Sequence, residues 1–126
     1  MEFIQKLGDG RVFLNYGPIQ MVLDISTSSG RKPELGFAVA EYVVEQFQKL
    51  IEHMDVIKTG NCGRDIKSLP PVAYKMINAV EKTGDRSLTP LAAVAGSFSE
   101  IALEKALDMG GERVIINNGG DIALKD

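Results

Sequence analysis

The sequence predicts an α+β fold in which an antiparallel sheet is backed by three helices. Strand-like segments occupy the start of the chain, segments with helical periodicity follow, and strand-like segments return at the end. The chain has 126 residues, of which 44% are hydrophobic and 25% charged, as is typical of one globular domain with its own core. We therefore expect residues 1–126 to form a single domain or the N-terminal portion of a larger one.

Three strands are expected before the first helix. Met1 to Leu7 and Arg11 to Asn15 flank Gly8-Asp9-Gly10 and predict a β-hairpin, because glycine accepts the positive φ of a turn at low cost. Apolar and polar residues alternate from Ile19 to Ile25, which is the period of a half-buried strand. Ser26 to Pro33 is rich in turn residues, so we expect a loop there.

Three helices are expected next. Apolar residues recur every three or four positions from Leu35 to Ile57. Pro70-Pro71 can open a second helix that runs to Lys82, because proline is well accepted at the first helical position. A third helix follows Thr89-Pro90 and should end at Gly110-Gly111.

The chain finishes with two apolar runs, Val114 to Ile116 and Ile122 to Leu124, on either side of Asn117-Asn118-Gly119-Gly120-Asp121. They predict two strands or one strand with a glycine bulge. The edge of the sheet at the last strand would be left open. We expect either oligomerisation or the missing C-terminal portion of a larger fold to cover it.

Composition excludes several classes of partner. The net charge of −3 provides no broad cationic field, so nucleic acid is not an expected partner. The chain has neither a signal peptide pattern nor an uncharged stretch long enough to span a bilayer, so no membrane is expected. Cys62 is the single cysteine and forms no internal disulfide, which favours a reducing, cytoplasmic location.

Two segments are candidates for one ligand site. Leu91 to Ser97 has no charge and little bulk, which fits either tight helix packing or close approach of a ligand. Asn117 to Asp121 is either an ordinary turn or a set of convergent polar groups at a strand end. The second interpretation predicts a crevice between the two segments, lined by Ala95, Gly96, Asn118, Gly119, Gly120 and Asp121.

Other residues give weaker signals. The Ser26 to Lys32 loop could bind an anion, although a solvated linker is favoured because the loop lacks P-loop spacing. Cys62 near Arg64 fits an ordinary loop thiol, and His53 has no second ligand at metal spacing. No Ser-His-Asp arrangement can be argued from the sequence.

Two joined motifs carry a resemblance to a known family. Pro90-Leu91-Ala92-Ala93-Val94-Ala95-Gly96, a helix of matching length and Arg113-Val114-Ile115-Ile116-Asn117-Asn118-Gly119-Gly120-Asp121-Ile122 resemble an uncharacterised group within the ApbE-like superfamily. The flanking Leu69 to Val72 and Thr83 to Asp85 are similar to that group as well. The resemblance covers about the second half of the chain.

The resemblance implies a T-fold-like domain that handles flavin. ApbE proteins are magnesium-dependent flavin transferases that move FMN from FAD onto a protein threonine. Ala95-Gly96 stands where these transferases have Lys-Gly, and their His-containing segment is absent. The resemblance therefore implies the fold more strongly than the transfer reaction.

Two functional classes remain. The first is binding of a flavin or nucleotide-type small molecule at the Gly-Gly-Asp turn, with FMN or FAD and magnesium as cofactors and with catalysis left open. In this class Asp121 would hold a divalent cation or accept a hydrogen bond from a ribose hydroxyl. The second is a non-catalytic structural domain that keeps the fold and assembles as a homo-oligomer.

Overall fold

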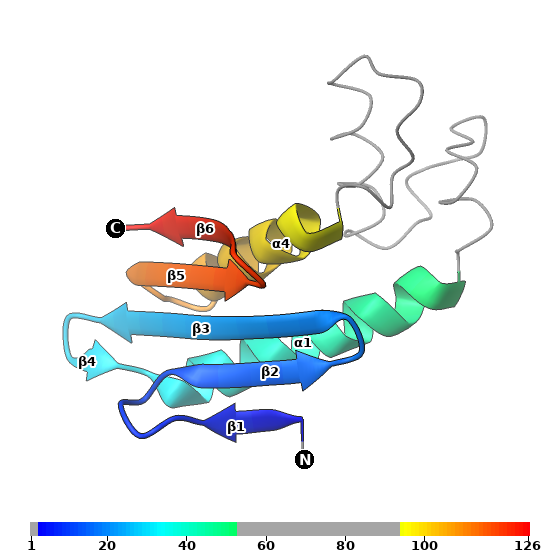
Figure 1. Cartoon of the computed structure of the whole chain (residues 1–126). Coiled ribbons are helices and arrows are strands. Elements are labelled where there is room, and N and C mark those ends of the chain that lie inside the picture. The colour runs from blue at the N-terminus through cyan, green and yellow to red at the C-terminus, as the bar shows by residue number, and fades with distance from the viewer. Residues whose placement is uncertain (1–2, 53–93) are drawn as a thin grey trace.

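The computed structural model describes residues 3–52 and 94–126, and every structural statement below concerns these residues. They form six strands and two helices (Figure 1). The elements in chain order are β1 (Ile4–Lys6), β2 (Val12–Tyr16), β3 (Ile19–Thr27), β4 (Gly30–Arg31), α1 (Pro33–Glu52), α4 (Val94–Asp108), β5 (Arg113–Asn118) and β6 (Asp121–Lys125).

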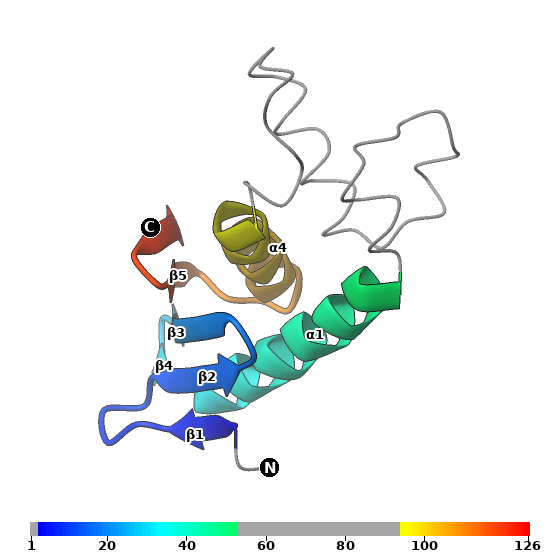
Figure 2. The ribbon, with the colours of Figure 1, turned by 45° about the vertical axis from the view of Figure 1, so that its right-hand side comes forward.

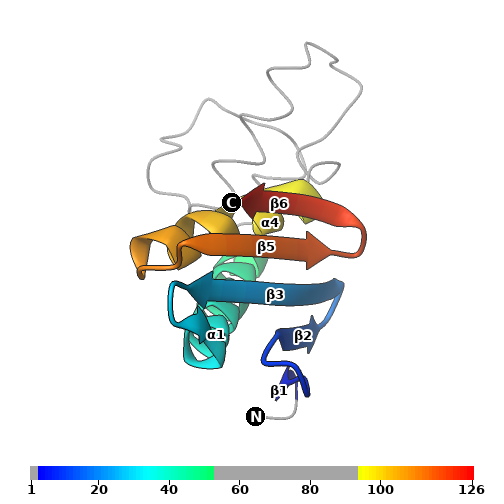
Figure 3. The ribbon, with the colours of Figure 1, turned by 90° about the vertical axis from the view of Figure 1, so that its left-hand side faces the viewer.

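The strands form one antiparallel sheet in the order β1-β2-β3-β5-β6, and the short β4 pairs with β3. Strand β3 is central and joins the two ends of the sequence, because Met21 lies opposite Asn118 and Ser26 lies opposite Arg113. Strands β1 and β6 lie at the two edges (Figure 3). The α+β class and the antiparallel sheet that the sequence predicts are therefore confirmed.

Both described helices pack on the same face of the sheet (Figure 2). Alternate residues from Val12 to Leu14 on β2, from Ile19 to Ile25 on β3 and from Val114 to Asn118 on β5 are buried, as the strand period requires. Neither helix is long and apolar enough to cross a membrane. The largest fully buried side chains are Phe98, Leu14, Ile19, Met21, Leu23, Ile116, Val12, Val39 and Val43.

The first helix approaches the sheet very closely at Gly36. A Cβ atom built on Gly36 would lie 2.5 Å from Cγ2 and 3.0 Å from Cβ of Val12. Val12 is fully buried on β2 and is β-branched, so its side chain has little freedom to move away. Only glycine allows α1 to lie this close to β2.

The end of α4 agrees with the sequence prediction. The Gly111 N–H donates to the Ala106 carbonyl at 2.9 Å, and the Gly110 N–H donates to the Leu107 carbonyl at 3.1 Å. Gly110 has φ of 100°, which completes the Schellman arrangement of a helix C-terminus. The prediction that Gly110-Gly111 ends the helix is confirmed.

The prediction of a loop from Ser26 to Pro33 is wrong. Strand β3 continues to Thr27, which pairs with Gly30 of β4, so Ser28 and Ser29 form a two-residue hairpin turn. Gly30 has φ of 111°, a conformation that side chains rarely adopt. The turn residues in this segment thus serve a hairpin.

Several of the other predicted elements are present in the structure. The first hairpin and the third strand are confirmed, and the last two apolar runs form two strands, β5 and β6, without a bulge. The first helix begins at Pro33, two residues earlier than expected. The predicted second helix from Pro70 to Lys82, the expected start of the third helix at Thr89-Pro90 and residues 53–57 lie outside the described residues.

Candidate functional site

The candidate site begins at the turn between β5 and β6. Asn118 pairs with Asp121, and the two glycines between them have positive φ, 59° for Gly119 and 99° for Gly120. Two positive values are what a type I′ hairpin turn requires. The Gly120 N–H donates to Asn117 Oδ1 at 2.8 Å, and the Gly119 N–H donates to the Gln20 carbonyl at 2.9 Å. These amides therefore stabilise the turn itself.

Asn118 holds the turn against β3. Its side chain is buried with 5% exposed, and its Oδ1 accepts a hydrogen bond from the Gln20 N–H at 3.2 Å. The buried amide thus fixes where the β5–β6 hairpin leaves the sheet. This role is structural.

The structure brings the start of α4 and the start of β6 together. A Cβ atom built on Gly96 would lie 3.5 Å from Oδ2 and 3.6 Å from Oδ1 of Asp121. The Ser99 hydroxyl, which is buried, donates to the Asp121 carbonyl oxygen at 2.9 Å. Gly96 therefore places no side chain against the Asp121 carboxylate. Ser99 fixes the position of the Asp121 backbone.

An open groove of about 320 Å³ lies between these segments. It is lined by Gly96, Ser97, Ser99, Glu100, Asp121, Ile122 and Ala123. Of the six residues predicted to form the crevice, Gly96 and Asp121 line the groove. Asn118, Gly119 and Gly120 are not among the lining residues, and the side chain of Ala95 lies outside the described part.

Sequence reasoning missed Ile122 and Ala123 on β6 as lining residues, and on α4 it missed Ser99 and Glu100. The latter two lie three and four positions after Gly96, and such positions share one face of a helix. Helical periodicity counted from Gly96 would have found them. Glu100 is exposed on α4.

The groove has acidic character. Glu100 and Asp121 supply two carboxylates, and the hydroxyls come from Ser97 and Ser99. The two carboxylates accept hydrogen bonds from hydroxyl groups and attract cations, whereas they would repel a phosphate that carries no cation. Among the described residues there is no cluster of three or more His, Cys, Asp or Glu that could hold a metal ion by itself. A cation at Asp121 would need further ligands from a bound molecule and water.

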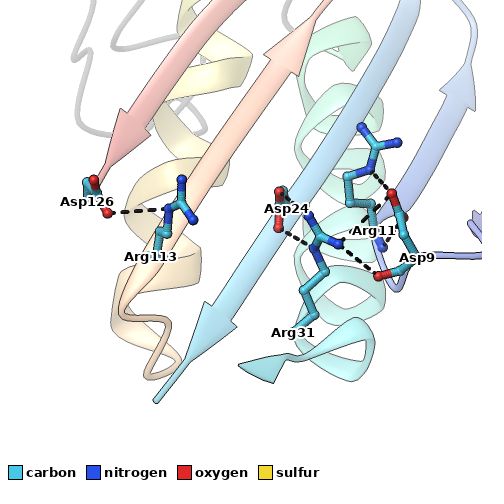
Figure 4. Close-up of polar contacts among 6 residues, drawn as sticks. All are labelled: Asp9, Arg11, Asp24, Arg31, Arg113 and Asp126. Atoms are coloured by element: carbon cyan, nitrogen blue, oxygen red, sulfur yellow. Dashed lines mark hydrogen bonds and ion pairs between the residues drawn. The ribbon is translucent and has the colours of Figure 1, made fainter. Parts of the chain in front are cut away.

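The predicted anion-binding alternative at Ser26 to Lys32 gains no support. Arg31 makes two hydrogen bonds to the Asp24 carboxylate, at 3.0 and 3.2 Å, and one to the Asp9 carbonyl at 3.1 Å (Figure 4). The Ser28 N–H donates to a carboxylate oxygen of Glu112 at 2.8 Å. The Arg31 guanidinium and the Ser28 N–H of this hairpin thus already bond to carboxylates of the protein.

The Asp9 carboxyl should titrate below its ordinary pKa. The Arg11 backbone N–H, and then its guanidinium, hold the pKa of the Asp9 carboxyl below 3.8. A lowered folded pKa means that the contribution of this turn to stability is present above the unfolded pKa and is lost as pH falls through the folded pKa. We expect the carbon-13 carboxyl shift of Asp9 to have its midpoint below 3.8.

The variant Arg11→Ala separates the two causes. This variant removes the guanidinium and keeps the backbone N–H. The midpoint of the Asp9 titration should therefore rise only part of the way to the ordinary pKa of an aspartate. A midpoint in the wild-type chain at or above 3.8 would contradict the assignment.

His53 and Cys62, the other weak candidates, lie outside the described residues.

Fold and groove define a class of protein: an α+β domain with an antiparallel sheet, two described helices on one face and a small acidic groove at the last hairpin. The chain belongs to the AbpE bacteria family, whose sequence model matches residues 4–126.

Curated relatives are found among archaeal UPF0280 proteins. The chain is 39% identical over 56 residues to one from Methanococcus aeolicus, a match that covers 44% of this chain and 23% of the relative. It is 40% identical over 53 residues to one from Archaeoglobus fulgidus, covering 42% and 22%. It is 38% identical over 58 residues to one from Methanosarcina barkeri, covering 46% and 22%. The chain thus matches less than a quarter of the length of these relatives, whose names state no activity.

Proposed function

We propose that the chain is an ApbE-like, T-fold-like domain that binds a flavin or nucleotide-type small molecule in the groove between α4 and β6. The observation that carries the proposal is the position of Gly96 beside the Asp121 carboxylate, because a Cβ atom there would lie 3.5 Å from Oδ2 and glycine leaves that space open. A ligand can approach Asp121 here without meeting a side chain at Gly96.

The chemistry of the groove favours a ligand rich in hydroxyl groups. Asp121 and Glu100 can accept hydrogen bonds from the ribose of a nucleotide or the ribityl chain of a flavin. The phosphates of the same ligand require a cation to offset the two carboxylates. Magnesium suits this role, because it commonly binds one or two carboxylates together with substrate phosphates. Asp121 is the residue that we propose to hold it.

Calorimetric titration tests the proposal. The chain, and the longest natural protein that contains it, are titrated with FMN, FAD and adenine nucleotides, with and without magnesium. We expect micromolar binding that magnesium strengthens. Asp121→Asn should weaken binding at least about tenfold, since a hydrogen bond to a charged group contributes about 1.5–3 kcal/mol.

Glu41→Gln is the matched control. It also removes one negative charge, but it lies on an exposed position of α1 that does not line the groove. Its affinity should equal that of the wild-type chain. Absence of binding by every ligand in both proteins, or equal loss in the two variants, would contradict the proposal.

A second function is favoured by a different observation. Ile122 and Leu124 are 55% and 59% exposed on an edge strand, which is typical of a surface that another protein covers. A non-catalytic assembly domain would use this surface and need no ligand. Flavin transfer onto a threonine-containing peptide by the longer protein would favour an enzyme over both binding roles.

A further inference from the structure

Strand β6 is an edge of the sheet in the part of the chain that the structure describes. Among the described residues its one strand neighbour is β5 (Figure 3). The side chains of Ile122 and Leu124 are exposed to solvent. The opposite edge, β1, has only three residues and carries the exposed polar Gln5 and Lys6. Short, polar edges resist pairing with other chains, whereas longer edges with apolar side chains promote it. Of the two edges, β6 is the one suited to association.

The backbone of β6 offers donors and acceptors on its open side. Asn118 and Asp121 close a two-residue turn and form the first pair of the hairpin. In such a hairpin the closing pair exchanges hydrogen bonds, and the next residue along the strand directs its N–H and C=O away from the partner strand. Ile122 and Leu124 therefore direct their backbone groups away from β5.

The sequence of β6 is complementary to itself in charge. Asp121 and Lys125 lie two positions before and two positions after Ala123, and Ile122 and Leu124 lie one position on either side of it. Antiparallel pairing of two copies centred on Ala123 places Asp121 of each copy opposite Lys125 of the other. It also places Ile122 opposite Leu124, so that the outward-directed backbone groups of the two strands meet.

We propose that β6 is a homodimer interface, in which two copies pair antiparallel about a two-fold axis at Ala123 and continue the sheet across both. Asp121, Ala123 and Lys125 lie on the helix side, since Val114, the cross-strand partner of Lys125, is buried there. Ile122 and Leu124 lie on the other side, where each covers its counterpart in the second copy. The interface thus gains two opposite-charge pairs and two apolar pairs.

Neighbouring registers lack the charge pairing. Centring the axis on Ile122 places Asp121 opposite Ala123 and Leu124 opposite Gly120. Centring it on Leu124 places Lys125 opposite Ala123 and Ile122 opposite Asp126. Only the Ala123 register pairs both charges and both exposed apolar residues, so electrostatics select it.

Charge exchange tests the interface in the full chain by sedimentation equilibrium. Lys125→Asp and Asp121→Lys each convert two attractive pairs into two repulsive pairs, and each should weaken dimerisation about tenfold or more. The double variant Asp121→Lys/Lys125→Asp restores attraction and should return the dimer constant to near the wild-type value. A chain that is monomeric throughout the micromolar range, or a double variant that associates no better than the single ones, would overturn the proposal.

Cysteine crosslinking tests the register and does not depend on the stability of the charge variants. In a Cys62→Ser background, Ala123→Cys places two Cα atoms about 4.5 Å apart across the axis, within the range that a disulfide spans. Oxidised glutathione should therefore link this variant into a covalent dimer. Leu124→Cys, which in this register faces Ile122, is the control and should link poorly. Preferential linkage at Leu124→Cys would overturn the Ala123 register.

This inference does not rest on the proposed function, although Asp121, Ile122 and Ala123 belong to both the groove and β6. Both experiments measure association in the absence of ligand. A monomeric chain would therefore overturn the interface alone, and a lack of ligand binding would overturn the proposed function alone.

Discussion

Phe98→Ala should destabilise the protein by about 3–5 kcal/mol, the usual cost of truncating a buried aromatic side chain. Phe98 is fully buried on α4, and its ring centroid lies 5.9 Å from that of Phe47 on α1. Its removal leaves a cavity where the two helices meet on the sheet. Thermal unfolding followed by circular dichroism should show a melting temperature lower by roughly 10–20 °C, or no cooperative transition.

The control for this prediction is Leu107→Ala. Leu107 is also on α4, but it is 37% exposed, so its truncation leaves no closed cavity. The cost should be about 1 kcal/mol or less. Comparable losses in the two variants would contradict the placement of Phe98 at the centre of the core.

Gly36→Ala should destabilise the protein by about 1–3 kcal/mol, the usual cost of overpacking, although alanine is a better helix former. The new methyl group would lie 2.5 Å from Val12 Cγ2, so either α1 or β2 must move. The midpoint of urea unfolding should fall with an unchanged slope, because the change affects stability without altering the surface exposed on unfolding.

Two further variants isolate the steric cause. Gly96→Ala on α4 is the matched control, because its methyl group would lie at an ordinary 3.5 Å from the nearest atom, and it should be neutral or stabilising by up to about 1 kcal/mol. Val12→Ala removes the clashing methyl groups. The double variant Gly36→Ala/Val12→Ala should therefore be less destabilised than the sum of the two single changes. If the losses in free energy of unfolding of the two single variants simply add in the double variant, direct contact between positions 36 and 12 is contradicted.

The candidate site was predictable in part. The turn residues from Asn117 to Asp121 and the small residues before Ser97 each identify a segment, and the structure brings Gly96 against Asp121. The sequence could not show which polar groups would remain available. The side chain of Asn118 bonds to β3, and the amides of the two glycines stabilise the turn, because a hairpin satisfies its own backbone first.

Local chemistry was sufficient for several of the described elements. Alternation from Ile19 to Ile25 defines a strand, and Gly110-Gly111 ends α4, because these signals depend on residues a few positions apart. Tertiary structure alone decided the order of the strands, the close approach of Gly36 to Val12 and the position of Ser99 beneath Asp121. These contacts join residues 22 to almost 100 positions apart, and their geometry depends on how both helices pack on the sheet.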